Sequence, residues 1–407
     1  MSAIASRPAA VATSAVVTTL LPLMAAVFVA YLVIGMAMPV LPLHVHQGLG
    51  LGTFVVGLVT GTQFTASLFS RVWAGQHADS KGAKHTVVTG LLVAAVAGFF
   101  YLVSLRFAAK PEASVGILLI GRALLGAAES FIITGALSWG LALLGAQNTG
   151  KVMAWLGTAL WGAFAAGAPV GTTLYAADGF AAIALATILI PLATLPLVAS
   201  FRSAASTGRA RAAFADVAGA VWVPGVGLAL SGVGFGAIVT FIALLFAQRG
   251  WSPAWLPFTS LSVAFMIGRI FFGHLPDKIG GAKVALVCVL IEAAGQAMIW
   301  LAPSSTLALA GVTLTGLGYS LVYPALGVEA VRRAPPQSHG LAMGSYTAFL
   351  DLSLGLASPA LGLIASVAGL NAVFLASTLA ALCTAPVALC LLHTPSVQRR
   401  EQCHTLL

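Results

Sequence analysis

Charged residues are scarce in this chain, and their scarcity excludes a soluble globular protein. Only 7% of the 407 residues are Asp, Glu, Lys or Arg, whereas 59% are hydrophobic and the mean hydropathy is +1.02. Soluble domains usually carry about 25% charged residues, so this chain would have almost no polar surface in water. An exterior that faces lipid removes this conflict, and the composition therefore predicts a membrane protein.

Cysteine is also scarce, and the signatures of several functional classes are missing. The four cysteines show no C-x-x-C spacing, which argues against a disulfide framework or a zinc site. The chain has no G-x-x-x-x-G-K-[ST] loop of a primary pump and no cluster of nucleophile, base or metal ligands. His44 and His46 lack a third ligand close in sequence and are interpreted as membrane-interface residues. We therefore expect no enzyme, no metal and no other cofactor.

Long apolar runs dominate what remains. About 20 apolar residues cross a bilayer as a helix, and these runs are about twice as long as the alternating strands of a membrane barrel. The sequence therefore predicts an all-α membrane protein with twelve spans, and the first run, too long for a signal-peptide core, is expected to be retained. The predicted spans are 17–43, 52–74, 85–105, 114–143, 152–174, 179–200, 221–246, 254–273, 284–302, 305–328, 338–367 and 371–392.

An internal repeat divides the chain into two halves. The pattern R-x3-G-x3-D-x2-G occurs twice, 198 positions apart, as Arg71, Gly75, Asp79 and Gly82 and again as Arg269, Gly273, Asp277 and Gly280. An offset of 190 also aligns Gly126 with Gly316 and Pro169 with Pro359. We therefore predict a first six-helix bundle in 1–200, a cytoplasmic linker in 201–220, and a second bundle with a short tail in 221–407. Duplicated halves around a midplane site are typical of transporters.

Basic residues predict the orientation. Fifteen of the 19 Lys and Arg residues fall on the side of the N-terminus, Arg106, Lys110 and Arg249 fall on the other side, and Arg122 lies inside a run. Because basic residues near helix ends are retained on the cytoplasmic side, both termini are predicted to be cytoplasmic. The net charge of +9 is spread over short loops, so it indicates topology and contact with the lipid bilayer, and we expect no nucleic-acid partner.

The repeated loop carries a family resemblance. Gly75-x3-Asp79-x2-Gly82-x-Lys84 resembles the cytoplasmic signature of the major facilitator superfamily, although Ser80 and Ala83 stand where that family often has basic residues. The stretches 36–43, 150–155 and 323–329 resemble the YfcJ/YhhS-like bacterial permeases. The resemblance implies twelve helices in two pseudo-symmetric bundles, alternating access, efflux-type transport and a bacterial inner (plasma) membrane.

The loop also has a physical interpretation as a gate. Asp79 follows the second apolar run and is placed to accept hydrogen bonds from a neighbouring helix N-terminus, whose dipole favours a carboxylate. Closure of this contact would favour the outward-open state. The alternative is an ordinary solvated hairpin. We assign both copies of the motif, together with Lys84, to gating.

Charges inside the apolar runs are the next candidates, because each is costly unless it faces water or a partner. Arg122 and Glu129 are two helical turns apart, too far for an easy direct ion pair, and Arg122-x3-Gly126 resembles the family motif that is associated with proton coupling. We expect Glu129 to carry the proton, with Arg122 as its electrostatic partner or an anion contact. Asp351 is the counterpart in the other half. Pairing with a helix dipole or a hydroxyl is the structural alternative for both carboxylates. For Glu292, packing or an interfacial salt bridge is favoured over transport.

A glycine-rich run in the fifth span resembles the family's antiporter motif, which has G-P where this chain has Ala168-Pro169. Small residues would let the fifth and eighth spans pack closely, and proline would kink the helix. We interpret the set as a hinge or seal, with ordinary helix packing as the alternative. Its members are Gly162, Gly167, Pro169, Gly171 and the second-half counterpart Pro359.

Polar and aromatic residues in the spans that line the cavity of related proteins are candidates for substrate contact, although packing is the alternative for each. They are Tyr31, Gln63, Trp161, Tyr319 and Tyr323. We therefore predict a monomeric, proton-coupled antiporter that exports a small organic solute, whether drug-like, sugar-like or an organic anion. Proton-coupled import and a transport-inactive sensor on the same scaffold remain alternatives.

Overall fold

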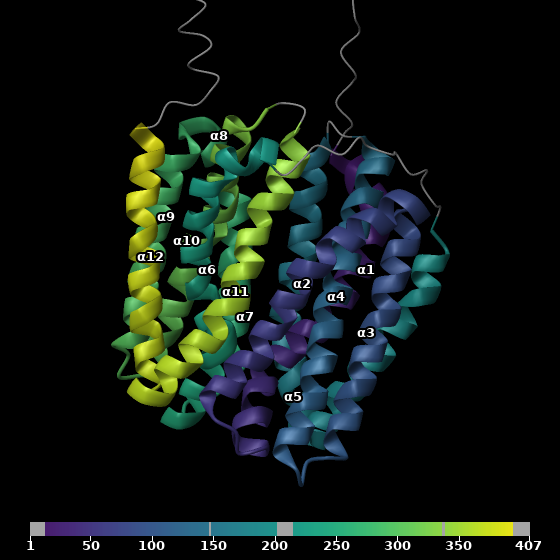
Figure 1. Cartoon of the computed structure of the whole chain (residues 1–407), viewed down its shortest axis with the longest axis vertical. Coiled ribbons are helices and arrows are strands. Elements are labelled where there is room, and N and C mark those ends of the chain that lie inside the picture. Colours follow the sequence, from purple (N-terminus) through teal and green to yellow (C-terminus); the bar gives the residue numbers. More distant parts are fainter. Residues whose placement is uncertain (1–12, 146–147, 202–214, 336–337, 394–407) are drawn as a thin grey trace, which may run out of the picture.

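The protein is built from helices that run roughly parallel through a single bundle (Figure 1). The computed structural model describes residues 13–145, 148–201, 215–335 and 338–393, and every regular element in these ranges is helical. The first half contains α1 (Thr13–Leu43), the π-helical turn η1 (His44–Gly48), α2 (Thr53–Lys81), α3 (Ala83–Leu105), α4 (Pro111–Leu144) and α5 (Thr149–Ala199). The second half contains α6 (Ala215–Arg249), α7 (Leu256–Phe272), α8 (Leu275–Ile279), α9 (Gly281–Trp300), α10 (Ser305–Arg333), α11 (His339–Ala368) and α12 (Leu370–His393).

The helices confirm the predicted spans. Among the described residues, ten helices are long and apolar enough to cross a membrane. One of these, the 51-residue α5, has non-helical backbone at Asp178 and Gly179, between the predicted fifth and sixth spans. The eighth predicted span is the 17-residue α7, so each of the twelve apolar runs coincides with one helical segment. The chain is therefore a multi-pass membrane protein whose backbone polar groups are satisfied within helices, as lipid requires.

The two halves lie side by side, with α1 to α5 on one side of Figure 1 and α6 to α12 on the other. The beginning of α1 and the end of α12 lie at the same end of the bundle, which we call the terminal end; the other is the opposite end. The predicted linker 201–220 is shorter than expected, because α6 already begins at Ala215. Most of that linker lies outside the described residues.

The last glycine of each repeated motif has a clear conformational reason. Gly82, between α2 and α3, has φ +90°, and Gly280, between α8 and α9, has φ +100°. Side chains disfavour this left-handed region, whereas glycine adopts it readily. The two copies therefore make equivalent tight turns at the terminal end of the bundle.

Contacts between the halves are concentrated toward the opposite end. Along the α2–α11 seam, Thr53 Oγ1 donates a hydrogen bond to the carbonyl of Gly362 at 2.8 Å, and Gly57 lies against the backbone of Ser358. Along the α5–α7 seam, Thr259 Oγ1 donates to the carbonyl of Ala165 at 2.8 Å. One apolar core spans both halves there, whereas the second half has a separate core at the terminal end.

Candidate functional site

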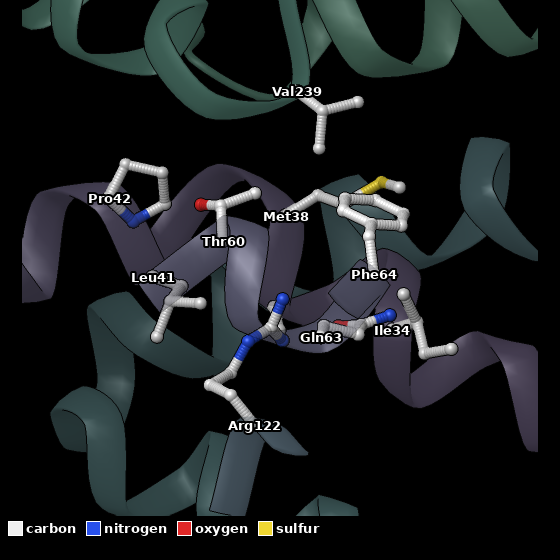
Figure 2. A pocket seen from close by; sticks show the side chains of 10 residues that line it. Ile34, Met38, Leu41, Pro42, Thr60, Gln63, Phe64, Arg122 and Val239 are labelled. Atoms are coloured by element: carbon white, nitrogen blue, oxygen red, sulfur yellow. The ribbon is translucent and has the colours of Figure 1, made fainter. Parts of the chain in front are cut away.

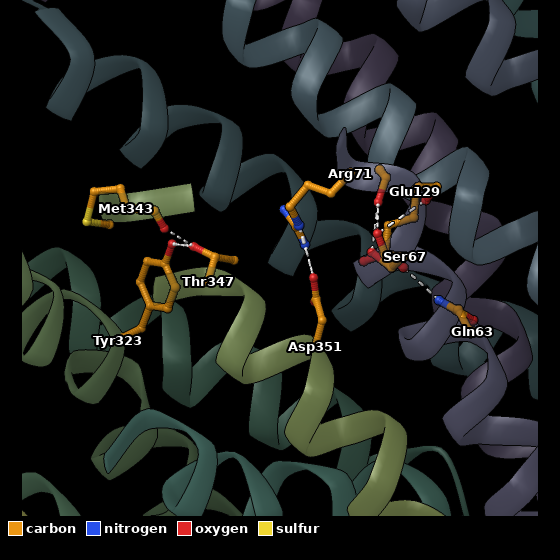
Figure 3. Close-up of polar contacts among 10 residues, drawn as sticks. Gln63, Ser67, Arg71, Glu129, Tyr323, Met343, Thr347 and Asp351 are labelled. Atoms are coloured by element: carbon orange, nitrogen blue, oxygen red, sulfur yellow. Dashed lines mark hydrogen bonds and ion pairs between the residues drawn. The ribbon is translucent and has the colours of Figure 1, made fainter. Parts of the chain in front are cut away.

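An ion pair crosses from one half of the molecule to the other. Arg71 on α2 donates to Asp351 on α11, through Nε to Oδ2 at 3.0 Å and through a second guanidinium nitrogen to the same oxygen (Figure 3). The Asp351 side chain is 9% exposed, whereas the Arg71 side chain keeps 26% exposure although it lies well inside the bundle. Asp351, the predicted second-half counterpart of Glu129, thus has a cationic partner in Arg71, a residue of the repeated motif.

Glu129 on α4 lies beside this pair but has a neutral partner. Its Oε2 accepts a hydrogen bond from Gln63 Nε2 on α2 at 2.8 Å, so two predicted site residues meet (Figure 3). Glu129 is within electrostatic range of Asp351, Arg71 and Arg122. One residue further along α4, Ser130 Oγ donates to the carbonyl of Ser67 at 2.8 Å. These contacts fix α4 against α2 and orient the Glu129 carboxyl toward the interior.

Arg122, the expected partner of Glu129, makes its direct contacts elsewhere. Its Nε donates to the carbonyl of Val59 at 3.3 Å, and another guanidinium nitrogen donates to the Tyr101 hydroxyl at 3.3 Å. Arg122 is buried and points into a small crevice between α1, α2, α4 and α6 (Figure 2). The crevice is lined by Ile34, Ala37, Met38, Leu41, Pro42, Thr60, Gln63, Phe64, Arg122 and Val239.

Four rings form an aromatic cluster across the α5–α7 seam: Trp161, Phe235, Phe265 and Tyr319. Trp161 from the first half stacks on Phe265, with centroids 3.8 Å apart. Phe235 and Tyr319 are stacked at 5.5 Å, and the ring of Trp161 meets that of Phe235 edge-on at 5.7 Å. Two of the five predicted cavity residues, Trp161 and Tyr319, therefore lie in one apolar wall.

The other two predicted tyrosines lie on either side of the interior. Tyr31 on α1 is buried and packs against Phe164. It is within electrostatic range of Glu129, Arg71 and Asp351. Tyr323 on α10 shares a hydrogen bond with Thr347 Oγ1 on α11 at 2.7 Å (Figure 3). Thr347 and the serines Ser67 and Ser130 were missed by sequence reasoning, because hydroxyl residues in apolar helices give no distinctive pattern.

The acidic residues of the repeated motif are exposed in this conformation. Asp79 and Asp277 face outward, and no described residue donates a hydrogen bond to either carboxylate. The helix N-terminus contact that was expected for Asp79 is instead made by Glu329, which accepts from the backbone N–H of Ala282 at 3.1 Å and pairs with Arg333. Within the motif region, Gly75 lies inside α2 and has no close neighbour, whereas Gly273 lies in the turn between α7 and α8.

Lys84, the last member of the first motif, has a structural contact. Its Nζ donates to the carbonyls of Ala199 at 2.6 Å and Phe201 at 2.7 Å, so it caps the C-terminal end of α5. This arrangement suits a cation, because the carbonyls at a helix end are free and carry partial negative charge. Lys84 therefore ties α3 to the end of the first half.

The glycines of the fifth span do not face the eighth span, contrary to expectation. Gly167 lies against the backbone of Gly35, and Gly171 lies against the carbonyl group of Met36, both on α1; Gly162 faces the Phe28 ring of the same helix. These positions share one side of α5, whereas the α5–α7 seam is made by another. Close packing within the first half therefore accounts for them, as small residues in membrane helices commonly do.

The two prolines of the proposed hinge differ in position. Pro359 on α11 lies at the α2–α11 seam, close to Gly57 and Gly61. Pro169 lies inside α5 on the helix whose glycines pack against α1. Only Pro359 is therefore placed directly between the halves.

Glu292 is part of a buried network within the second half. It accepts a hydrogen bond from Ser231 on α6, and one turn later Gln296 donates to the carbonyl of Gly234 at 3.1 Å and accepts from Ser377 Oγ at 2.7 Å. This supports the packing role expected for Glu292. No group of three or more His, Cys, Asp or Glu side chains in the described part of the chain is arranged to hold a metal ion.

Comparisons with known proteins agree with this architecture. The family model described as Major Facilitator Superfamily matches residues 23–280 and 225–402. An uncharacterized MFS-type transporter of Salmonella typhimurium is 42% identical over 91% of this chain and 95% of its own, and the uncharacterized MFS-type transporter YhhS of Escherichia coli is 39% identical over 86% of each.

Among solved structures, a bacterial homologue of the human lysosomal transporter Spinster, crystallised in an inward-facing and unoccupied conformation, superposes with a TM-score of 0.74 at 13% identity, covering 93% of this chain and 97% of the other. At this identity the match supports the fold alone. The family match extends over nearly all of the chain, and the two relatives named above are 42% and 39% identical to it. The chain is therefore a member of the Major Facilitator Superfamily of transporters.

Proposed function

We propose that the protein is a proton-coupled antiporter that exports a small organic solute across the bacterial inner membrane by alternating access. The observation that carries the proposal is the Arg71–Asp351 ion pair, which joins the two halves beside the half-buried carboxyl of Glu129. A proton-coupled carrier needs a group whose charge changes inside the membrane and a contact between its halves that responds to that charge. These three residues supply both.

Electrostatics link the two carboxyl groups through one cation. Arg71 is within range of Asp351, its present partner, and of Glu129. When Glu129 is protonated, Asp351 has no competitor for the guanidinium and the contact between the halves is favoured. When Glu129 loses its proton, its negative charge attracts Arg71 toward the first half and weakens that contact. Proton binding at Glu129 is thereby coupled to the strength of the ion pair that joins the halves.

The conformation fits an inward-facing carrier if the terminal end is cytoplasmic, as the basic residues predict. The halves are then joined on the outer side, by the Thr53–Gly362 and Thr259–Ala165 hydrogen bonds, and less joined on the inner side. Asp79 accepts no hydrogen bond from a described residue in this state. We propose that it gains one when the inner side closes, which retains its gating role.

Transport is favoured over the other classes by family membership, since members of this superfamily carry small solutes. Export rather than import is favoured by the sequence of the fifth span, which resembles the family's antiporter motif. We further propose that one copy of the chain suffices, because the candidate site lies between its own two halves. A sensor without transport would bind solute and move no protons.

Purified protein in liposomes tests the proposal directly. A pH-sensitive dye is enclosed, a chemically diverse set of solutes is added, and wild type is compared with Glu129→Gln. We expect proton movement evoked by one solute class in the wild type, and none with that class in Glu129→Gln, because the amide cannot release a proton at this position. Glu112→Gln is the control, since Glu112 is exposed in the first turn of α4 and should behave as wild type.

Three outcomes would contradict parts of the proposal. Proton flux that persists in Glu129→Gln would transfer the proton site to Asp351. Solute movement without proton flux would indicate a uniporter, and solute binding without movement would indicate a sensor.

A further inference from the structure

At one pair of equivalent positions, Asp351 and Trp161, the two halves carry different chemistry next to an arginine. The repeated motif makes Arg269 on α7 the counterpart of Arg71 on α2, and the offset of 190 makes Trp161 on α5 the counterpart of Asp351 on α11. At the α2–α11 seam the arginine therefore faces a carboxylate. At the α5–α7 seam the equivalent arginine lies beside an aromatic wall instead.

Arg269 has no acidic partner within the described residues, where the ion pairs involve only Arg71, Arg332 and Arg333. It is half-buried in the last turn of α7, and its guanidinium carbon lies 5.9 Å from the centroid of the Phe265 ring. A guanidinium in a membrane protein is costly unless it meets an anion or water, and stacking on a phenyl ring offsets only part of that cost.

The surroundings of Arg269 combine one charge with flat apolar surfaces. Phe265, beneath the guanidinium, is stacked with Trp161, and both belong to the aromatic cluster that crosses the seam. The Tyr323 hydroxyl is within electrostatic range of both Arg269 and Arg71. Among the described residues, the Tyr323 hydroxyl bonds to Thr347, whose own hydroxyl donates to the carbonyl of Met343. Tyr323 can therefore donate to a substrate by turning away from Thr347.

We propose that Arg269 and the aromatic cluster form a substrate subsite for a small organic anion, in which the guanidinium binds a carboxylate and the half-buried Trp161 ring, the most accessible ring of the cluster, packs against a planar apolar body. The subsite names the substrate class of the transporter proposed above and rests on that function. Arginine suits this role because its planar fork binds a carboxylate through two parallel hydrogen bonds. A pocket with an apolar wall and a few convergent polar groups is typical of small-molecule sites.

The asymmetry also separates the roles of the two arginines. Arg71 already has a carboxylate within the protein and serves the contact between the halves. Arg269 leaves its donors available for a carboxylate that arrives with the substrate. A substrate anion at the α5–α7 seam would take the place that Asp351 holds at the α2–α11 seam, so that loading would complete the second inter-half contact.

Matched acids and amides test the charge requirement, because each pair has nearly the same shape. The probes are benzoate against benzamide, 4-hydroxybenzoate against 4-hydroxybenzamide, and nicotinate against nicotinamide, titrated into detergent-purified full-length protein at neutral pH by calorimetry. For at least one pair we expect the acid to bind wild type about tenfold more tightly than its amide, since the amide lacks the charge that strengthens hydrogen bonds to arginine. In Arg269→Gln the acid and its amide should bind with about equal affinity, and Arg269→Lys should keep part of the preference for the acid.

Arg249→Gln is the matched control, because Arg249 also lies over an aromatic ring, Trp251 at 5.8 Å, but is exposed at the opposite end. It should retain the wild-type preference. Melting temperatures without ligand show whether each variant is folded. If Arg269→Gln does not fold, Arg269→Lys takes its place as the test variant. The proposal is overturned if no acid is preferred to its amide by wild type, or if the preference persists without Arg269. Binding in detergent needs no transport, so this result is independent of the liposome experiment.

Discussion

Arg71 on α2 and Asp351 on α11 form an ion pair at matching depth in the two helices. Arg71 lies 18 residues after the start of α2 and Asp351 lies 17 residues before the end of α11, which places each roughly 26 Å from the opposite end of the bundle. Because α2 begins and α11 ends at that opposite end, the pair lies on the terminal-end side of the closely packed part of the seam. Among the described residues, it is the polar link between the halves that lies nearest the terminal end.

Removal of either charge should impair transport, whereas reversal of the pair should restore part of it. Asp351→Asn and Arg71→Gln each leave one charge without its partner inside the bundle, a change that costs on the order of 3 kcal/mol when the site is buried and less at a partly exposed arginine. We expect each single variant to lower the solute transport rate at least about tenfold. Arg71→Asp combined with Asp351→Arg should recover a measurable fraction of it.

Asp178→Asn is the control for these variants, because Asp178 is exposed at the break in α5 and should leave the rate unchanged. Membrane insertion and melting temperature should be measured for all variants. A double variant no better than the single ones would show that the pair's contact is not what matters at these two positions.

The glycines of α5 should matter for stability rather than for coupling. A methyl group at Gly171 would meet the backbone of Met36 on α1, which cannot move away as a flexible side chain would. Gly171→Ala should therefore lower the melting temperature, by a free energy of roughly 1–3 kcal/mol. Gly157→Ala, on the same helix with open space around it, should not. An uncoupled but equally stable Gly171→Ala variant would support the seal function instead.

The fold was largely predictable because the physical constraint of the bilayer is simple. A helix must be long and apolar, and each predicted run coincides with a helical segment to within a few residues at most ends. Two predicted bounds were less accurate. The span predicted to end at residue 74 continues as α2 to Lys81 through the polar motif, and the span predicted to begin at residue 221 begins as α6 at Ala215. Hydropathy marks the part of a helix in lipid and gives no signal for turns that continue into water.

The candidate site was predictable as a set of residues but not as a set of contacts. Burial of charge singled out Glu129 and Asp351, yet the partner of Asp351 is 280 positions away, and no spacing rule connects residues on different helices. The glycine face of α5 was assigned to the wrong neighbour for a related reason. Periodicity shows which residues share a face, whereas the three-dimensional packing of the bundle decides what that face meets.

Lys84 should stabilise the first half without a direct part in transport. Its ammonium group holds two carbonyls at the end of α5, and hydrogen bonds from charged donors contribute about 1.5–3 kcal/mol when shielded but less in water. We expect Lys84→Met to reduce stability by about 1 kcal/mol, seen as a lower melting temperature. Lys81→Met is the control, since Lys81 is exposed at the end of α2. Equal melting temperatures for the two variants would contradict the capping role.

Gly57 should control the balance between the two conformations of the carrier. It lies at the α2–α11 seam near the opposite end, where a Cβ atom would collide with the backbone of Ser358 and lie 2.8 Å from the Cα atom of Pro359. Gly57→Val should therefore separate the halves at that end and favour the state that opens there. Gly116→Val, at a position with no neighbour, is the matched control.

Accessibility labelling distinguishes this effect from simple misfolding. In a variant whose four native cysteines are replaced, a single cysteine at Thr60 would report on the crevice, which is narrow in the present conformation. A membrane-impermeant thiol reagent added from the opposite side should label it several-fold faster in Gly57→Val than in wild type or Gly116→Val. Unchanged labelling with a normal melting temperature would show that the seam tolerates the added side chain, and close packing at Gly57 would then not hold the halves in this state.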